Sequence, residues 1–167
     1  PVLYRDQDFD GWPYKPGYTN GIHNDQGWSI SNCIVDAQYA YAGMAARLGT
    51  NITGTSFIQG PYFPDGIGSL SYRMRKTTNS VANPSVQIQL SANGVGWTAV
   101  ATNTATSTAW DQIILFRQDP TNHFVRFVHT AGGSPVPIDD IRIGVPQPRP
   151  EIAITPGTSP SAPSDSQ

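Results

Sequence analysis

The sequence predicts an all-β domain, built as a two-sheet antiparallel β-sandwich of about nine strands. Three observations support this fold class. Strong helix formers are scarce, since the 167 residues include only two lysines and one glutamate. Short segments of alternating apolar and polar residues recur along the chain. Turn residues (Gly, Asn, Pro and Ser) separate these segments, and no 3.6-residue apolar period is sustained.

The predicted strands follow one another at the spacing of a sandwich. The clearest alternation places Leu70, Tyr72 and Met74 on one face of a strand. Residues 36–44 are expected to form a short helix or a loop, and residues 12–18 a long loop, because the prolines there exclude a central strand. The predicted strands are residues 28–35, 44–48, 55–62, 69–76, 85–91, 97–102, 111–117, 124–129 and 138–143.

Length and composition indicate one domain, residues 1–145, followed by a Pro/Ser/Thr-rich linker or disordered tail at residues 146–167. The formal net charge is −2 and no basic run is present, which excludes the electrostatic footprint of a nucleic-acid binder. No apolar run approaches the roughly 20 residues needed to span a membrane. Because such tails join modules of secreted proteins, we expect an extracellular or cell-surface location.

Residues with catalytic potential stand in no catalytic motif. Cys33 is the only cysteine, so no intrachain disulfide forms, and its apolar neighbours indicate a buried, inert thiol. His23, His123 and His129 show neither metal-ligand spacing nor a nucleophile motif. No pattern pairs the aspartates as the two carboxylates of a glycoside hydrolase are paired. The sequence therefore predicts that the protein is not an enzyme.

Two short acidic patches bracket the chain. Asp8 and Asp10 lie near its start, and Asp139 and Asp140 are adjacent near the end of the predicted domain. If the first and last strands lie side by side, the two patches meet. Neighbouring carboxylates repel unless a cation or an arginine lies between them. Ca²⁺, which takes about six to eight oxygen ligands, would remove that repulsion.

Planar hydrogen-bonding side chains occupy the polar face of two consecutive predicted strands. Arg73 and Arg75 are on the first strand, and Gln87 and Gln89 are on the second. If these strands pair, the four groups form one polar patch of the kind that recognises sugars. An ordinary solvated sheet face is the alternative.

Aromatic rings outside the core would complete such a site, because a ring face packs against the C–H face of a sugar. Tyr14, Tyr18 and Trp97 are the rings that we expect to bind ligand. Trp12 is expected to plug one end of the sandwich, and Trp28 and Trp110 are expected in the core. Tyr39, Tyr41 and Tyr62 are further candidates for exposed rings.

Several short motifs occur in a set order along the chain. They are Phe9-Asp10, Gly27-Trp28-Ser29-Ile30, Ser69-Leu70-Ser71-Tyr72-Arg73, a hairpin from Ser91 to Trp97, and Ile138-Asp139-Asp140-Ile141. Over residues 4–145, this order resembles the galactose-binding-like jelly-roll modules of bacterial secreted proteins, close to MAM-like domains and to the carbohydrate-binding domains attached to polysaccharide-degrading enzymes. The resemblance implies a jelly-roll sandwich.

The resemblance also implies a structural Ca²⁺. Asp10 would supply the early ligand, Asp139 or Asp140 the late one, and backbone carbonyls the rest. This sequence departs from the commoner pattern, because Asp rather than Glu follows the Phe. The alternative is that the carboxylates are held by Arg142 or by backbone N–H groups.

We therefore expect a non-catalytic carbohydrate-binding module, tethered to other domains of a larger secreted or surface protein. Arginines on the outer face would suit an anionic polysaccharide, since guanidinium pairs bidentately with carboxylate or sulfate. The alternative is a structural or adhesive β-sandwich that mediates protein–protein assembly at the cell surface. The expected partner is a polysaccharide or other glycan, rather than nucleic acid or a membrane.

Overall fold

The computed structural model describes residues 3–23, 27–49, 55–79, 82–131 and 133–147. Every regular element in these ranges is a β-strand, and no membrane-spanning helix occurs among them. The strands are β1 (Leu3–Gln7), β2 (Lys15–His23), β3 (Trp28–Asp36), β4 (Ala45–Leu48), β5 (Phe57–Gln59), β6 (Ile67–Met74), β7 (Ser85–Ser91), β8 (Thr98–Thr104), β9 (Asp111–Asp119), β10 (Phe124–Ala131) and β11 (Val136–Gly144). The predicted all-β sandwich is confirmed.

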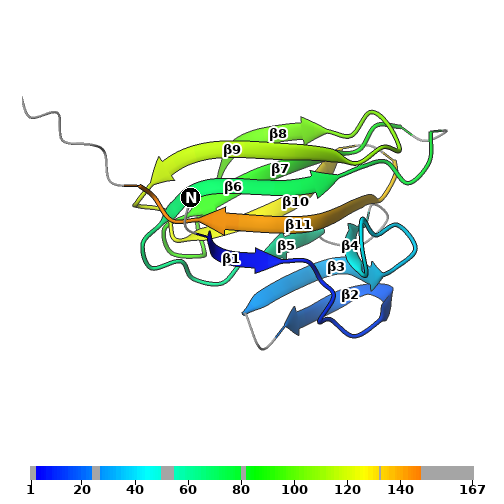
Figure 1. The fold of residues 1–167 in the computed structure, drawn as a ribbon, viewed down its shortest axis with the longest axis horizontal. Coiled ribbons are helices and arrows are strands. Elements are labelled where there is room, and N and C mark those ends of the chain that lie inside the picture. Colours follow the sequence, from blue (N-terminus) through cyan, green and yellow to red (C-terminus); the bar gives the residue numbers. More distant parts are fainter. Residues whose placement is uncertain (1–2, 24–26, 50–54, 80–81, 132, 148–167) are drawn as a thin grey trace, which may run out of the picture.

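The strands follow one antiparallel path that folds into two layers (Figure 1). The order along this path is β8-β7-β10-β5-β3-β4-β11-β6-β9. We call β4, β11, β6 and β9, with β1 beside β11, the front sheet, and β8, β7, β10 and β5 the back sheet. The strand β3 joins the layers, because one half of it pairs with β5 and the other half with β4.

The first and last strands lie side by side, which is the condition for the two acidic patches to meet. In the pairing of β1 with β11, Leu3 lies opposite Gly144 and Gln7 lies opposite Ile141. This pairing brings the two ends of the domain together on the front sheet, next to β6 (Figure 1). The early acidic patch, just after β1, and the late one, within β11, therefore come to the same region of the fold.

The prediction of a loop over residues 12–18 is wrong for its second half. β2 begins at Lys15 and pairs with β3, so Pro16 lies within a strand. The proline is tolerated because β2 lies outside the main path of the sheet, and its pairing shifts between Lys15 and Thr19. Residues 37–44, in contrast, connect β3 to β4 through turns and bends without a helix.

Alternating residues of the two sheets build the core. Leu70, Tyr72 and Met74 of β6 are at most 1% exposed, and burying one apolar side chain of this size stabilises the fold by about 1.5–3 kcal/mol. The rings of Tyr72 and Phe127, one from each sheet, meet edge to face at a centroid distance of 5.0 Å. Asn103 of β8 donates to the Tyr72 hydroxyl at 3.0 Å, which ties the two sheets together.

The tryptophans and the cysteine divide between core and surface. Trp28 is fully buried, so its prediction as a core residue is confirmed. Trp12 is also buried and packs against Phe9 with a centroid distance of 6.0 Å. Cys33 is fully buried, and burial raises the pKa of its thiol to about 12, so the thiol is protonated at neutral pH. The prediction for Trp110 is wrong. Trp110 directly precedes the edge strand β9 and stays partly exposed outside the core.

Candidate functional site

The four polar side chains predicted to form one patch lie on two different sheets. Arg73 and Arg75 belong to β6 and the residue after its end, in the front sheet, whereas Gln87 and Gln89 belong to β7 in the back sheet. β6 pairs with β9 and β11, and β7 pairs with β8 and β10. The prediction of a single patch is therefore wrong. The two arginines and the two glutamines contact different side chains, one set on each sheet.

On the front sheet, Arg73 holds an exposed aromatic ring. Its guanidinium carbon lies 4.0 Å from the centroid of the Tyr41 ring, and its Nε donates to Asp140 Oδ2 at 3.1 Å. The Tyr41 ring also meets Trp110 in a T-shaped contact with centroids 6.0 Å apart. Tyr41 nevertheless stays 49% exposed. The ring is held from two directions and keeps about half of its surface open to solvent.

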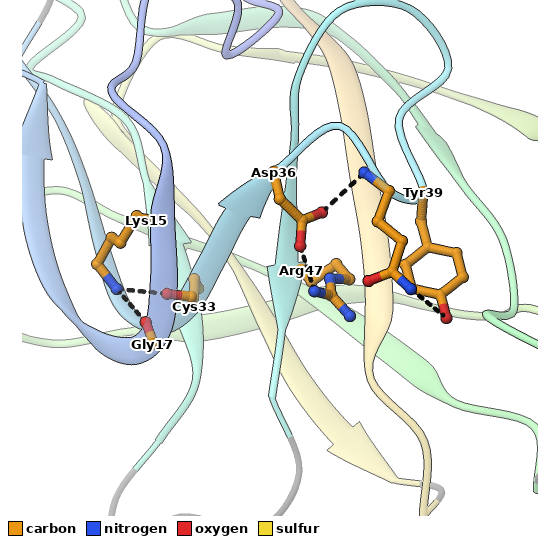
Figure 2. Close-up of polar contacts among 7 residues, drawn as sticks. Lys15, Gly17, Cys33, Asp36, Tyr39 and Arg47 are labelled. Atoms are coloured by element: carbon orange, nitrogen blue, oxygen red, sulfur yellow. Dashed lines mark hydrogen bonds and ion pairs between the residues drawn. The ribbon is translucent and has the colours of Figure 1, made fainter.

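Two further arginines extend this cluster. The guanidinium carbon of Arg75 lies 5.7 Å from the Trp110 ring centroid and 5.8 Å from that of Tyr39. Arg47 lies 4.9 Å from the Tyr39 centroid and forms an ion pair with Asp36 (Figure 2). Each such cation–ring contact contributes about 0.5–1 kcal/mol at an exposed position. We call the set the arginine–aromatic face: Tyr39, Tyr41, Arg47, Arg73, Arg75 and Trp110.

The predicted ring Tyr18 lies at the margin of this face. It comes from β2, and its phenol lies within electrostatic range of Arg47 and Tyr39. Burial raises the pKa of Tyr18, because it disfavours the charged phenolate. Tyr14, the other ring predicted from this segment, is 69% exposed just before β2. Lys15 anchors the start of β2 by donating to the carbonyls of Gly17 and Cys33 at 2.6 and 2.5 Å (Figure 2).

The back sheet carries a second polar cluster, in which the groups bond to one another. Arg126 donates to Gln89 Oε1 at 2.6 Å, and Gln89 in turn donates to Gln87 Oε1 at 2.5 Å. The guanidinium carbon of Arg126 lies 4.3 Å from the centroid of the half-buried Trp97 ring. Burial lowers the pKa of Arg126. We call Gln87, Gln89, Trp97 and Arg126 the amide face.

The two acidic patches converge on the loop that carries Tyr41. Asp10 Oδ1 accepts the backbone N–H of Met44 at 2.7 Å, and Asp139 Oδ2 accepts the N–H of Tyr41 at 2.9 Å. Asp10 also packs directly on Gly43, where an added Cβ would lie 1.9 Å from its Oδ1. We call these contacts the aspartate clasp. The clasp fixes the backbone of the ring that stands most exposed on the arginine–aromatic face.

The predicted calcium ligands Asp10, Asp139 and Asp140 differ in their surroundings. Asp139 is 2% exposed, and burial raises the pKa of its carboxyl to about 6, although the N–H groups of Tyr41 and Asp140 lower it. Asp140 is engaged elsewhere, because it pairs with Arg73. In the ranges that the structure describes, no three His, Cys, Asp or Glu side chains gather as metal ligands. The carboxylates of Asp10 and Asp139, which bind the same loop through its N–H groups, are oxygen donors of the kind that Ca²⁺ takes, and calcium stays a prediction.

Sequence reasoning underrated several residues of these faces. Arg47 and Arg126 carried no motif, and Trp110 looked like a core residue within an apolar strand pattern. Tyr39 and Tyr41 are candidates for exposed rings in the sequence, which does not show their arginine neighbours. The pairing of strands distant in sequence brings these residues together, and a pattern along one segment does not reveal that pairing.

No model of a known protein family matches the chain, and a search of curated proteins found no match. Solved structures share its fold. The K1 cleaved adhesin domain of Lys-gingipain from Porphyromonas gingivalis has a TM-score of 0.61 at 15% identity, covering 84% of this chain and 97% of that domain. The CBM22-1 xylan-binding domain of Paenibacillus barcinonensis Xyn10C has a TM-score of 0.59 at 11% identity, covering 89% and 97%.

A third structure, TmCBM61 in complex with β-1,4-galactotriose, has a TM-score of 0.57 at 12% identity and covers 87% of this chain and 99% of that one. At such identities the likeness concerns the fold. The chain therefore has the β-sandwich fold of carbohydrate-binding and adhesin modules, as the resemblance in sequence implied. The residues that recognise a ligand must be argued from this chain itself.

Proposed function

We propose that this domain is a non-catalytic carbohydrate-binding module and that its ligand lies on the arginine–aromatic face. The observation that carries the proposal is the Tyr41 ring, half exposed yet held by Arg73 and Trp110. A ring fixed in this way loses little conformational freedom when a ligand stacks on it. The guanidinium groups around it offer several donors of fixed geometry to sugar hydroxyls.

The fold supports this proposal without deciding the ligand. Among the structures that share the fold, one is a xylan-binding domain and another is a complex with β-1,4-galactotriose. The proline-rich segment after residue 146 suits a tether to a larger secreted or surface protein, in which the module would raise the concentration of its partner domains near a polymer.

One arginine of this face, Arg75, is available to bind an acidic group of the glycan. Arg47 and Arg73 have carboxylate partners, whereas Arg75 donates its Nε to the carbonyl of Lys76 at 3.0 Å and joins no ion pair with a described residue. We therefore expect a preference for uronate or sulfated polymers, with affinity that falls several-fold as salt rises. Salt-insensitive binding to neutral glycans alone would contradict this preference.

Affinity electrophoresis through gels containing neutral or acidic polysaccharides tests the proposed function. The wild-type domain should be retarded by at least one polymer, and Tyr41→Ala should weaken that retention about tenfold or more, as loss of a central aromatic contact does. Tyr62→Ala is the matched control, because Tyr62 is 52% exposed, contacts His123 and Phe124, and does not belong to the arginine–aromatic face. Equal losses for both variants, or no retention of the wild type on a broad panel, would refute the proposal.

We also propose that Ca²⁺ binds at the aspartate clasp through Asp10, Asp139 and carbonyls of the loop between them. Thermal unfolding provides the test. A chelator should lower the unfolding midpoint of the wild type, and added Ca²⁺ should restore it, since a ligand of the folded state stabilises by mass action. Asp10→Asn should make the midpoint insensitive to chelator, whereas Asp8→Asn should not. A wild-type midpoint indifferent to chelator would remove calcium from the account.

A further inference from the structure

The outer edge of the front sheet exposes apolar side chains. β9 is the last strand of that sheet and pairs only with β6 among the described strands. Ile114 is 56% exposed and Phe116 is 73% exposed. These two residues alternate along β9, so they share one face. An edge strand with exposed apolar residues is a template for pairing, and β9 contains neither the lysine nor the proline that commonly blocks such pairing.

This exposure is particular to β9. Among the side chains that the structure describes, Ile114 and Phe116 are the only large hydrophobic ones that are both exposed and within a strand. The edge strand of the back sheet, β8, presents threonines instead, with Thr102 and Thr104 exposed. The two edges of the sandwich therefore differ in chemistry, and only one of them offers an apolar surface for docking.

We propose that β9 pairs with β9 of a second copy of this chain, in antiparallel fashion, so that the front sheets of two molecules become continuous. The charges of the strand support this occupant. When Ile114 lies opposite the same residue of the second copy, Asp111 lies opposite Arg117, and symmetry makes this pair twice. Both side chains are exposed, and no ion pair joins either to a described residue.

The same charges select the register. If the symmetry axis instead passed through Leu115, Asp111 would face Asp119 of the second copy, and the like charges would repel. Pairing around Ile114 also places Phe116 opposite Gln112 on the outer face, where each ring lies diagonal to an Ile114 side chain. The edge is therefore self-complementary in one register, as an isologous twofold interface requires.

Such a dimer would matter for ligand binding, although it rests on observations independent of the proposed function. The twofold axis of an antiparallel strand pair is perpendicular to the sheet, so the outer faces of both front sheets point the same way. The two arginine–aromatic faces of a dimer could then bind the same polymer. Once the first face is bound, binding of the second is intramolecular, which raises the overall affinity. Because a single strand pair buries little area, we expect a weak, concentration-dependent dimer.

Sedimentation equilibrium of the full chain at about 10 µM to 1 mM tests the proposal. The apparent mass should rise from the 18.0 kDa of the monomer toward twice that value. Phe116→Lys should weaken the dimer more than tenfold, because a lysine on an edge opposes pairing. Thr102→Lys on β8 is the matched control and should leave the dimer unchanged. A wild-type chain that stays monomeric throughout, or equal effects of both lysines, would overturn the proposal.

Charge exchange tests the register within the same experiment. Asp111→Arg alone and Arg117→Asp alone should each weaken the dimer, and the double variant should restore it, because each pair then regains opposite charges. Failure of the double variant to restore it would overturn the proposed register.

A third measurement separates a second copy from the chain's own C-terminal segment. The N–H of Gln147 donates to Gln118 Oε1 at 2.6 Å, which brings the chain to the end of β9. A full-length chain that dimerises only after Ile152→Lys and Ile154→Lys would show that this segment covers β9, and would overturn the proposal.

Discussion

The outer faces of the two sheets use the same kinds of side chain to different effect. On the arginine–aromatic face, Arg73 supports the Tyr41 ring from one side and leaves it 49% exposed. On the amide face, Arg126 lies over the half-buried Trp97 and hydrogen-bonds to Gln89, which bonds to Gln87. The first cluster holds a ring ready for a ligand, whereas the groups of the second largely satisfy one another.

The difference shows why a list of polar and aromatic residues does not define a binding site. Each face contains a tryptophan and at least one arginine. A group that already has its hydrogen bonds gains little when a ligand offers the same bonds, since one bond is only exchanged for another. A fixed ring with open surface gains contact area at little entropic cost. Ligand binding should therefore depend on the front sheet and not on the back sheet.

The largest expected effect comes from removing one arginine that contacts an aromatic ring on each face, Arg73 on the front sheet and Arg126 on the back sheet. Arg73→Ala takes away the support of the Tyr41 ring and leaves Asp140 without its partner, so we expect glycan affinity to fall about tenfold or more, a change of about 1.4 kcal/mol or more. Arg126→Ala should leave affinity within about twofold, although it disrupts the amide face. Isothermal titration with an oligosaccharide of the retained polymer measures both. The reverse ranking would move the site to the back sheet.

A smaller effect is expected from two glycines that lie near the two faces. Gly43 has φ +55, and an added Cβ would collide with the Asp10 carboxylate, so Gly43→Ala should strain the loop that carries Tyr41. We expect a loss of stability of about 1–3 kcal/mol and a several-fold loss of affinity.

Gly96→Ala is the matched control beside Trp97. An added Cβ at Gly96 would meet no atom within 4 Å, so this variant should change neither property. Thermal unfolding and titration of the two variants separate these outcomes. A neutral Gly43→Ala would show that the clasp does not position Tyr41.

The smallest expected effect is a pH dependence that belongs to the back sheet. Burial lowers the pKa of His129 on β10, although its hydrogen bond to the Ser134 carbonyl raises it. Because the folded pKa lies below the unfolded value of about 6.5, the folded state favours the neutral ring. This contribution to stability is present above about pH 6.5 and is lost as pH falls through that value toward the folded pKa.

Unfolding midpoints of the wild type and His129→Gln at pH 7.5 and pH 5 measure this contribution. The wild-type midpoint should fall more on acidification than that of the variant. Glycan affinity, measured at both pH values, should not distinguish the two proteins, because His129 lies outside the arginine–aromatic face. Parallel pH profiles of stability in both proteins would show that His129 does not contribute.

Much of the fold was predictable because the alternation of apolar and polar residues along a strand indicates which side chains are buried. The pattern at β6 identified Leu70, Tyr72 and Met74 as core residues, and all three are buried. The strand β2 was missed because Pro16 argues against a central strand, although an edge strand with an interrupted ladder tolerates it. Local sequence gives no sign that a strand will lie at an edge.

The candidate site was predictable only in part. Arg73 and Arg75 were recognised on the polar side of one strand, but their neighbours come from other segments. Tyr41 is brought to Arg73 by a loop that the aspartate clasp holds, and Trp110 arrives from the start of β9. These side-chain contacts depend on the pairing of strands that are distant in sequence, which a pattern within a single strand cannot specify. The acidic patches were among the motifs that indicated a jelly-roll sandwich. Only the structure shows that they hold the loop that carries Tyr41.

The most direct test of the central claim is a nuclear magnetic resonance titration of the isotope-labelled domain with an oligosaccharide of the retained polymer. If the arginine–aromatic face binds the ligand, the backbone and side-chain signals of Tyr41, Arg73 and Trp110 should shift progressively. The signals of Gln89, Trp97 and Arg126 should stay in place. Shifts confined to this second group would contradict the account and assign ligand binding to the amide face.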